Sequence, residues 1–312
     1  MDVDDFLDIP YASAAPVGDR DGPHDPLRSF DLFVPRPTTT TTENRPERSG
    51  GSVSGVAAQA LQVARPPPLV CFVHGGAWRS EDKTDHGALA RGLAAYTSFP
   101  VAVPNYRLTG PDNEVRHPAH ARDVLQLLAF LLAWPGPLEG SRSPPYDPTR
   151  MFLIGHSCSA HMLACILLDS SEPALVPSAP LLRAVRGVVF AEGIYDIDAL
   201  LRSFPAYRDW FIRDTFGDLS AYDRYSTTKM TLREGASHIC WVILHSKGDT
   251  LVDTAQSHAM YGHLQSLCDG RPGNVGSVVK SFDDLKGEHN AILQSVKYTE
   301  IVGDFILNVT NI

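Results

Sequence analysis

The fold is decided by the stretch Met151-Phe152-Leu153-Ile154-Gly155-His156-Ser157-Cys158-Ser159-Ala160, after which a helical pattern continues through Leu168. Its first four residues are apolar without alternation, which is typical of a strand buried on both faces. The residues that follow are mostly small, and Gly155 allows the backbone to turn sharply. The stretch therefore predicts a strand, a tight turn and a helix, with Ser157 at the turn.

Similar apolar runs recur along the chain and predict further buried strands. They are residues 69–73, 188–190 and 240–244, with weaker candidates at 101–103 and 278–282. Between these runs, apolar residues at helical spacing predict a helix over 119–134 and a closing helix over 292–309. Strands that alternate with helices indicate an α/β fold, in which a mostly parallel central sheet is flanked by helices and carries functional loops at the carboxyl ends of its strands.

Charge and composition exclude several classes of function. The 312 residues include 27 Lys and Arg against 36 Asp and Glu, giving a net charge of −9 that is spread along the chain. Nucleic acids and anionic membrane surfaces require clustered basic charge, so we expect neither as a partner. The acidic start Met1-Asp2-Val3-Asp4-Asp5 lacks the features of a secretory signal, and the five cysteines show no zinc-site spacing. These features favour a cytoplasmic protein with reduced thiols.

Two segments differ from the alternating pattern. Residues 36–68 contain an unbroken threonine run, end in three prolines and hold few large apolar side chains, so we expect a flexible surface insertion. Residues 196–235 are rich in aromatic and arginine side chains, and we expect them to form a small helical cap over the strand ends. The chain is thus predicted to be a single α/β domain over 1–312 with one insertion and one cap.

A second motif, His74-Gly75-Gly76-Ala77-Trp78, follows the predicted strand at 69–73. Adjacent glycines let the backbone approach a substrate and direct its N–H groups into a site. In α/β-hydrolases such a loop forms one side of an oxyanion hole, and the N–H of the residue after the nucleophile forms the other. An ordinary Gly-Gly turn is the alternative, but the Ser157 turn in the same chain favours an oxyanion hole built from Gly75, Gly76 and Cys158.

The Ser157 turn departs from the G-x-S-x-G pattern of a nucleophile elbow at one position. Gly155 occupies the first glycine position, whereas Ser159 stands where the pattern has its second glycine. Small residues are needed there because the turn brings backbone close to backbone, and serine is small enough to be accommodated. We therefore expect Ser157 to be a nucleophile.

A serine nucleophile requires a base and an acid, which follow it in the order Ser, Asp, His in this fold. Asp249 lies on the loop after the predicted strand at 240–244, whereas the competing Asp253 is expected to cap the next helix. His289 is the last histidine of the chain and lies on a loop before the closing helix. We predict a triad in which His289 takes the proton of Ser157 and Asp249 orients His289.

The remaining histidines favour structural roles. His156, His74 and His245 adjoin the predicted site and are expected to point elsewhere or brace their loops through hydrogen bonds. His117 and His120 form a potential metal pair, but no third ligand lies nearby in sequence. The prediction therefore includes no metal and no cofactor.

These motifs resemble those of the kynurenine formamidases (arylformamidases), especially the fungal type. The resemblance rests on HGGxW at 74–78, on the charged residues 79–82, and on the segments 104–108, 117–120 and 193–197, and it covers roughly residues 69–310. It implies hydrolysis of N-formyl-L-kynurenine to L-kynurenine and formate in tryptophan catabolism, with triad positions Ser157, Asp249 and His289.

Selectivity for such a substrate must come from its amine side, because formyl is the smallest acyl group. Trp78 and Tyr195 are the candidates for contact with the substrate's aromatic ring. The small-molecule substrate is the only partner that this reaction requires. For the assembly of the chain, a homodimer is one of the states that the sequence leaves open. The alternatives are a general carboxylesterase with the same triad and a non-catalytic ligand-binding relative of the fold.

Overall fold

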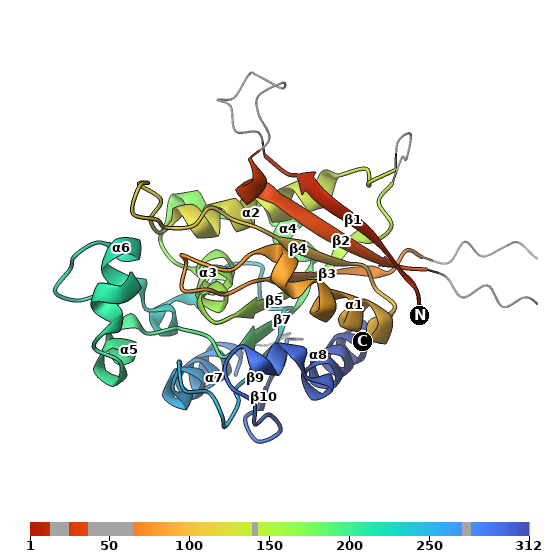
Figure 1. Ribbon diagram of the computed structural model, residues 1–312. Coiled ribbons are helices and arrows are strands. Elements are labelled where there is room, and N and C mark those ends of the chain that lie inside the picture. The colour runs from red at the N-terminus through yellow and green to blue at the C-terminus, as the bar shows by residue number, and fades with distance from the viewer. Residues whose placement is uncertain (13–24, 37–64, 139–142, 270–275, 312) are drawn as a thin grey trace, which may run out of the picture.

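The computed structural model describes residues 1–12, 25–36, 65–138, 143–269 and 276–311 (Figure 1). At its centre lies an eight-stranded sheet with the order β1-β2-β4-β3-β5-β7-β9-β10. Its strands are β1 (Val3–Pro10), β2 (Ser29–Pro35), β3 (Pro68–Val73), β4 (Val101–Pro104), β5 (Asp147–His156), β7 (Val185–Ala191), β9 (Cys240–Leu244) and β10 (Val278–Ser281). The insertion predicted at 36–68 falls largely on residues 37–64, which lie outside the described residues.

The six strands from β3 to β10 in this sheet run parallel to one another, and each corresponds to a predicted apolar run. β2 pairs antiparallel with β4, and β1 pairs antiparallel with β2. The predicted α/β fold with a mostly parallel sheet is therefore confirmed. Parallel strands end at the same edge of the sheet, so the loops after β3, β5, β7 and β9 converge there.

The sequence analysis did not identify β1 and β2. No residue of β1 is fully buried, and Asp4, Asp5 and Asp8 interrupt its apolar residues, so the segment does not have the pattern of a buried strand. Charged residues are common on edge strands because they discourage pairing with another chain. β2 is mostly buried, but Asp31 interrupts its apolar run. That carboxylate is paired with the buried ammonium of Lys83 at 2.7 Å.

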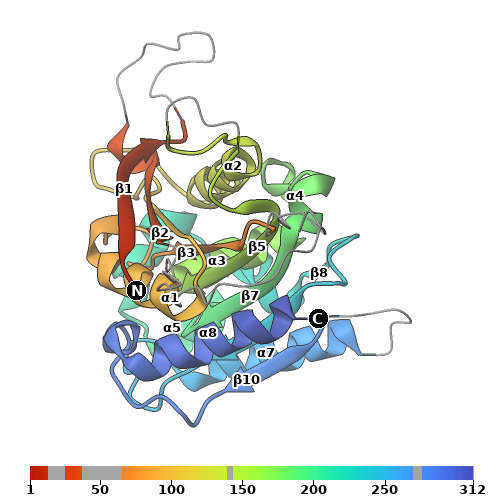
Figure 2. The same ribbon diagram turned by 90° about the vertical axis from the view of Figure 1, so that its right-hand side faces the viewer.

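Helices cover both faces of the sheet. They are α1 (Gly87–Thr97), α2 (Ala119–Ala133), α3 (Cys158–Leu167), α4 (Ala179–Ala184), α5 (Ile197–Ser203), α6 (Arg213–Phe216), α7 (Thr254–Cys268) and α8 (Val296–Thr310). α1 and α8 pack side by side on one face (Figure 2), whereas α2, α3 and α7 cover the other. None of the described helices is long and apolar enough to cross a membrane.

The two faces explain the absence of alternation in the predicted strands. In β3, Leu69, Cys71 and Val73 belong to the core that contains α2 and α3, whereas Val70 and Phe72 belong to the core that contains α1 and α8. Every side chain of this strand is buried. A strand covered on both faces requires apolar residues at successive positions, as the sequence shows.

The predicted closing helix begins later than the apolar spacing indicated. Residues Ala291–Gln294 form a separate 3₁₀ turn, and Ser295 is extended before α8 starts at Val296. The Ser295 side chain accepts a hydrogen bond from the Tyr298 N–H at 3.1 Å, so it caps α8. The prediction of one continuous helix over 292–309 was wrong at this point, because a strong capping residue interrupts the apolar periodicity.

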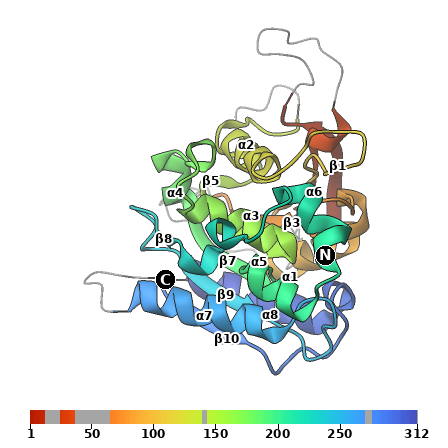
Figure 3. The ribbon, with the colours of Figure 1, turned by 90° about the vertical axis from the view of Figure 1, so that its left-hand side faces the viewer.

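The segment predicted as a cap, 196–235, consists of short helical pieces. α5 is followed by a π-helical turn (Arg208–Ile212), by α6 and by two 3₁₀ turns. The segment ends in β8 (Thr231–Leu232), which pairs antiparallel with β6 (Leu168–Asp169). Figure 1 shows α5 and α6 at one end of the molecule, and Figure 3 views the molecule from that side.

Candidate active site

Ser157 lies at a sharp turn between the end of β5 and the start of α3. Its backbone has φ 58° and ψ −123°, a conformation that a non-glycine residue adopts only when its surroundings hold it there. The Ser157 N–H donates to the carbonyl of Ala191 at 2.9 Å. A Cβ atom at Gly155 would lie 2.8 Å from the nitrogen of Ala160, so only glycine fits there. The turn has the geometry of a nucleophile elbow.

Ser159, which replaces the second glycine of the elbow pattern, is fully buried and hydrogen-bonded. Its Oγ accepts from the His156 N–H at 2.7 Å and donates to the Val73 carbonyl at 2.6 Å. The hydroxyl therefore links the elbow to the end of the neighbouring strand β3. This departure from the pattern strengthens the attachment of the turn to the sheet.

The loop at 74–78 packs directly against this elbow. A Cβ atom on Gly75 would lie 3.0 Å from the Cβ of Ser157, and one on Gly76, at φ 88°, would lie 2.1 Å from the Ser80 carbonyl oxygen. The Tyr106 hydroxyl donates to the Gly75 carbonyl at 2.6 Å. The Trp78 N–H donates to Cys158 Sγ at 3.2 Å. Both glycines are therefore required by close packing, and the side chain of Cys158 anchors the loop beside Ser157.

Trp78 and Tyr195, the predicted ring-binding residues, are core side chains. Both are fully buried. The Trp78 ring lies 5.1 Å from the ring of Phe216, and the Tyr195 ring lies 5.7 Å from that of Phe190. Neither residue lines the cleft at Ser157. The prediction that they contact a substrate is corrected, because both side chains fill the core beneath the motif.

Asp249 and His289 come together from two loops at the carboxyl edge of the sheet. His289 Nδ1 lies 2.8 Å from Asp249 Oδ2. The other carboxylate oxygen of Asp249 accepts from the N–H groups of Leu251 at 2.8 Å and Val252 at 3.0 Å. Burial raises the pKa of Asp249, but the hydrogen bond and charge of His289 and these two N–H groups bring it below its ordinary value. Asp249 is therefore ionised at neutral pH.

The competing carboxylate, Asp253, caps α7. Its side chain accepts from the Gln256 N–H at 3.3 Å, as the sequence predicted. This leaves Asp249 as the carboxylate of its loop that pairs with His289.

Sequence reasoning missed Glu192, a second carboxyl group beside His289. It is fully buried directly after β7, with Oε2 at 3.5 Å from His289 Nδ1 and 3.3 Å from His156 Nε2. Its Oε1 accepts from the Ser246 N–H at 3.2 Å. Burial and the nearby charge of Asp249 raise the pKa of Glu192 to about 9. A charged residue at the carboxyl end of a buried strand was the signal that could have identified it.

The other histidines near the site hold its loops. His156 Nε2 lies 3.1 Å from the His289 carbonyl oxygen, and burial together with the charge of His289 keeps the pKa of His156 well below its ordinary value. His245 Nδ1 lies 2.9 Å from Ser257 Oγ. His120 Nε2 lies 2.9 Å from Thr109 Oγ1. These rings are neutral and act through hydrogen bonds to neighbouring segments.

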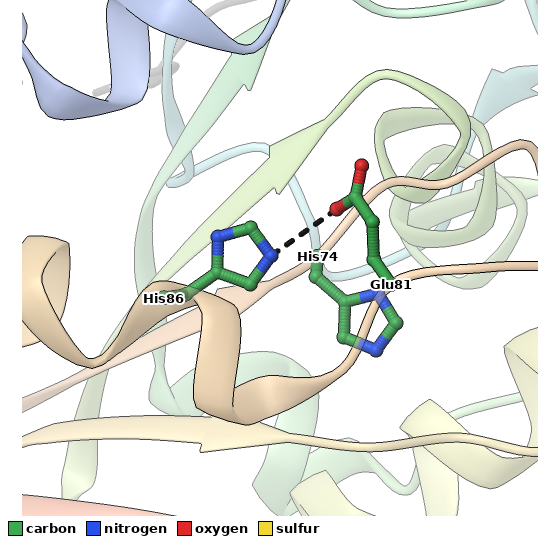
Figure 4. Close-up of side chains that lie close together, drawn as sticks. All are labelled: His74, Glu81 and His86. Carbon is green, nitrogen blue, oxygen red and sulfur yellow. Dashed lines mark hydrogen bonds and ion pairs between the residues drawn. The ribbon is translucent and has the colours of Figure 1, made fainter.

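Two groups of side chains within the described residues have the composition of a metal site. One is His156, Glu192 and His289, at the candidate active site, and the other is His74, Glu81 and His86 (Figure 4). In the second group, His86 Nε2 lies 3.1 Å from Glu81 Oε2. His74 Nδ1 lies 3.2 Å from the Gly75 carbonyl oxygen, which only accepts hydrogen bonds, so this nitrogen carries a proton. The group is therefore a His86–Glu81 pair beside a neutral His74 rather than a set of three free ligands.

A cleft of about 130 Å³ opens onto Ser157 and His289. The cap segment provides one wall through Tyr207, Trp210 and Phe211, whose rings pack on one another. The Trp210 side chain is half exposed at the mouth. The cleft therefore combines a serine and a histidine with an aromatic wall.

Comparisons with known proteins agree with this geometry. A family model described as BD-FAE matches residues 59–181. Curated kynurenine formamidases are similar over most of the chain: that of Meyerozyma guilliermondii is 26% identical, covering 76% of this chain and 83% of the relative. That of Saccharomyces cerevisiae is 25% identical, covering 76% and 88%. A probable isoprenylcysteine alpha-carbonyl methylesterase of Oryza sativa is 28% identical, covering 73% and 55%.

Solved structures of esterases share the fold. An inhibited esterase B of Lactobacillus rhamnosis superposes with a TM-score of 0.66 at 15% identity, covering 99% of this chain and 88% of the esterase. Carboxyl esterase 2 of Tuber melanosporum superposes with a TM-score of 0.59 at 16% identity, covering 90% and 82%. At this identity the likeness concerns the fold alone. The comparisons show that the chain has the α/β-hydrolase fold and is similar to fungal kynurenine formamidases at 25–26% identity.

Proposed function

We propose that the chain hydrolyses N-formyl-L-kynurenine to L-kynurenine and formate, with Ser157 as nucleophile, His289 as base and Asp249 as the carboxylate that orients His289. The observation that carries the proposal is the 2.8 Å contact between His289 and Asp249 at a cleft that Ser157 also lines. The aromatic wall of the cleft supports an aromatic amine as leaving group, and the similarity to fungal kynurenine formamidases supports a formyl group as the acyl part.

In the proposed mechanism, His289 takes the hydroxyl proton of Ser157, and Oγ attacks the formyl carbon. The N–H groups of Gly75, Gly76 and Cys158 stabilise the oxyanion. Removing one such donor typically costs about 3–4 kcal/mol of transition-state stabilisation. His289 then donates its proton to the departing aromatic amine. Water, deprotonated by His289, attacks the formyl-serine ester and releases formate. Asp249 stabilises the imidazolium and keeps the neutral ring in the tautomer with a proton on Nδ1.

The proposal is tested by adding the purified chain to N-formylkynurenine and following the loss of its absorbance. Hydrolysis of short p-nitrophenyl esters is measured in parallel for comparison. We expect turnover of the formamide, and Ser157→Ala should lower it at least about a thousandfold because the nucleophile is lost. Good ester cleavage without formamide turnover would instead favour the general carboxylesterase. That candidate is supported by the similarity to the probable isoprenylcysteine alpha-carbonyl methylesterase of Oryza sativa.

A fluorophosphonate probe addresses the third alternative, a non-catalytic binding protein. We expect the probe to label the wild-type chain and not Ser157→Ala, because the probe reacts only with an activated serine. Absence of labelling in the wild-type chain would contradict both hydrolase candidates.

A further inference from the structure

Glu81 lies where the active-site cleft meets a second, larger cavity. Both cavities are lined by Glu81 and Asn290. The second cavity measures about 520 Å³ and is bounded by the 3₁₀ turn Lys83–His86, by α1 and by the start of α8. Glu81 and Asn290 therefore lie between the cleft at Ser157 and a neighbouring cavity large enough for a polar tail.

The side chains around the two cavities include carboxylates but no strong cation. The carboxylates are Glu81 and Asp85, and no lysine or arginine is among the residues described as lining either cavity. The remaining polar groups of the second cavity are neutral amides and hydroxyls together with His86. An ammonium group on the substrate's tail would therefore meet charge of opposite sign, whereas the carboxylate beside it would find only the neutral amides and hydroxyls and His86.

Glu81 is held as a fixed, ionised carboxylate. Its Oε2 accepts from His86 Nε2 at 3.1 Å, and its other oxygen points away from both His74 and His86 (Figure 4). Burial raises the pKa of Glu81, but the hydrogen bond and charge of His86 bring it below its ordinary value. The backbone at Glu81 has φ 70°, and the capping box of Asp82 and Asp85 follows it directly. The side chain is 18% exposed, so it remains accessible to a ligand.

We propose that Glu81 binds the ammonium group of the substrate's leaving amine at the junction of the two cavities. This inference rests on the proposed function and deepens it, because it selects acylated aromatic amines that carry a primary ammonium on their tail. The ammonium donates a hydrogen bond to the carboxylate oxygen of Glu81 that His86 leaves unoccupied. An ammonium–carboxylate hydrogen bond of this kind contributes about a tenfold gain in affinity or more.

The inference is tested by binding rather than turnover, which separates it from the proposed reaction. Isothermal titration calorimetry compares L-kynurenine with its desamino analogue, 4-(2-aminophenyl)-4-oxobutanoate, which lacks only the α-ammonium. We expect the wild-type chain to bind L-kynurenine about tenfold more tightly. Equal affinities, or no measurable binding of either compound, overturn the inference without any variant. A chain that shows the preference but does not hydrolyse N-formylkynurenine would contradict the proposed reaction and leave the Glu81 subsite standing.

Glu81→Gln then assigns the preference to this side chain. We expect the ratio of the two dissociation constants to fall to about one in Glu81→Gln, because the amide is uncharged. The matched control is Glu300→Gln, which removes the same charge from a half-exposed side chain of α8 that pairs with Lys297 at 3.6 Å. The control should retain the tenfold ratio. An undiminished ratio in folded Glu81→Gln, judged by its thermal transition, overturns the assignment.

Discussion

The loops after β7 and β9 each direct a carboxyl group at the same nitrogen of His289, yet they hold those groups in opposite protonation states. Asp249, from the loop after β9, lies 2.8 Å from His289 Nδ1 and accepts two backbone N–H bonds. Glu192, at the end of β7, lies 3.5 Å from the same nitrogen and accepts one backbone N–H bond. The pKa of Asp249 is lowered, whereas burial and the charge of Asp249 raise that of Glu192 to about 9.

The difference shows how two carboxyl groups share one buried site. Donors that favour the charged form surround Asp249, so it ionises first, and its charge then opposes ionisation of Glu192. At neutral pH the site therefore holds one negative charge and one protonated acid. A single carboxylate suffices to stabilise the His289 imidazolium in the proposed mechanism, and a second would carry an additional desolvation cost.

Removing the charge of Asp249 should have the largest effect on activity, because Asp249 is the charged member of the two carboxyl groups. In Asp249→Asn, the amide can donate to His289 Nδ1 and favour the wrong tautomer for proton transfer from Ser157. We expect kcat/KM for N-formylkynurenine to fall by about three to four orders of magnitude, with the fold retained. Steady-state kinetics would measure the loss of kcat/KM, and the thermal unfolding transition would show whether the fold is retained. A loss below tenfold would mean that Glu192 replaces Asp249 as the charged partner of His289.

Replacing Glu192 tests whether this residue is protonated at neutral pH, through the pH dependence of the free energy of unfolding. The pKa of Glu192 in the folded protein, about 9, lies above its ordinary value of 4.5 in the unfolded chain. The contribution of Glu192 to the free energy of unfolding is therefore fully present below about pH 4.5 and is lost as the pH rises toward 9. Glu192→Gln, which cannot ionise, lacks this loss. We therefore expect its free energy of unfolding to increase relative to the wild type between pH 6 and 9, by at most about 1.4 kcal/mol per pH unit.

Urea denaturation of both chains at pH 6, 7, 8 and 9 measures this difference. For Asp249 the dependence of stability on pH has the opposite direction. Because the pKa of Asp249 is lowered in the folded protein, Asp249 stabilises the fold at pH values above its pKa in the unfolded chain, and this stabilisation is lost as the pH falls through its pKa in the folded protein. A stability difference between Glu192→Gln and wild type that does not change with pH would show that Glu192 is already ionised at neutral pH.

Much of this architecture could be predicted from the sequence because local patterns encode it. The six parallel strands were visible as apolar runs, since burial on both faces leaves no room for polar positions. The Ser157 turn and the glycine loop were visible because close backbone packing demands small residues at adjacent positions. The capping role of Asp253 followed from its place before a helical pattern, and the structure confirms it.

What escaped prediction depends on contacts between distant segments. The Glu192 side chain reaches His289 across 97 residues of sequence, and the parallel order of β7, β9 and β10 brings the two loops together. Trp78 was misjudged because its neighbours, Phe211 and Phe216, come from the cap segment. β1 escaped because an exposed edge strand needs little apolar character. In each case the missing information was the three-dimensional neighbour rather than the residue itself.

The smallest expected effect belongs to Asp253, which shares its loop with Asp249 and provides the matched control for that variant. Asp253→Asn removes the same charge four residues away but keeps a side-chain oxygen that accepts from the Gln256 N–H at the start of α7. Asparagine and aspartate are nearly equivalent at this capping position, so we expect a stability change within about 0.5 kcal/mol and kcat/KM within twofold of wild type. A loss comparable to that of Asp249→Asn would show that charge anywhere on this loop, rather than the direct contact of Asp249 with His289, determines the reactivity of the site.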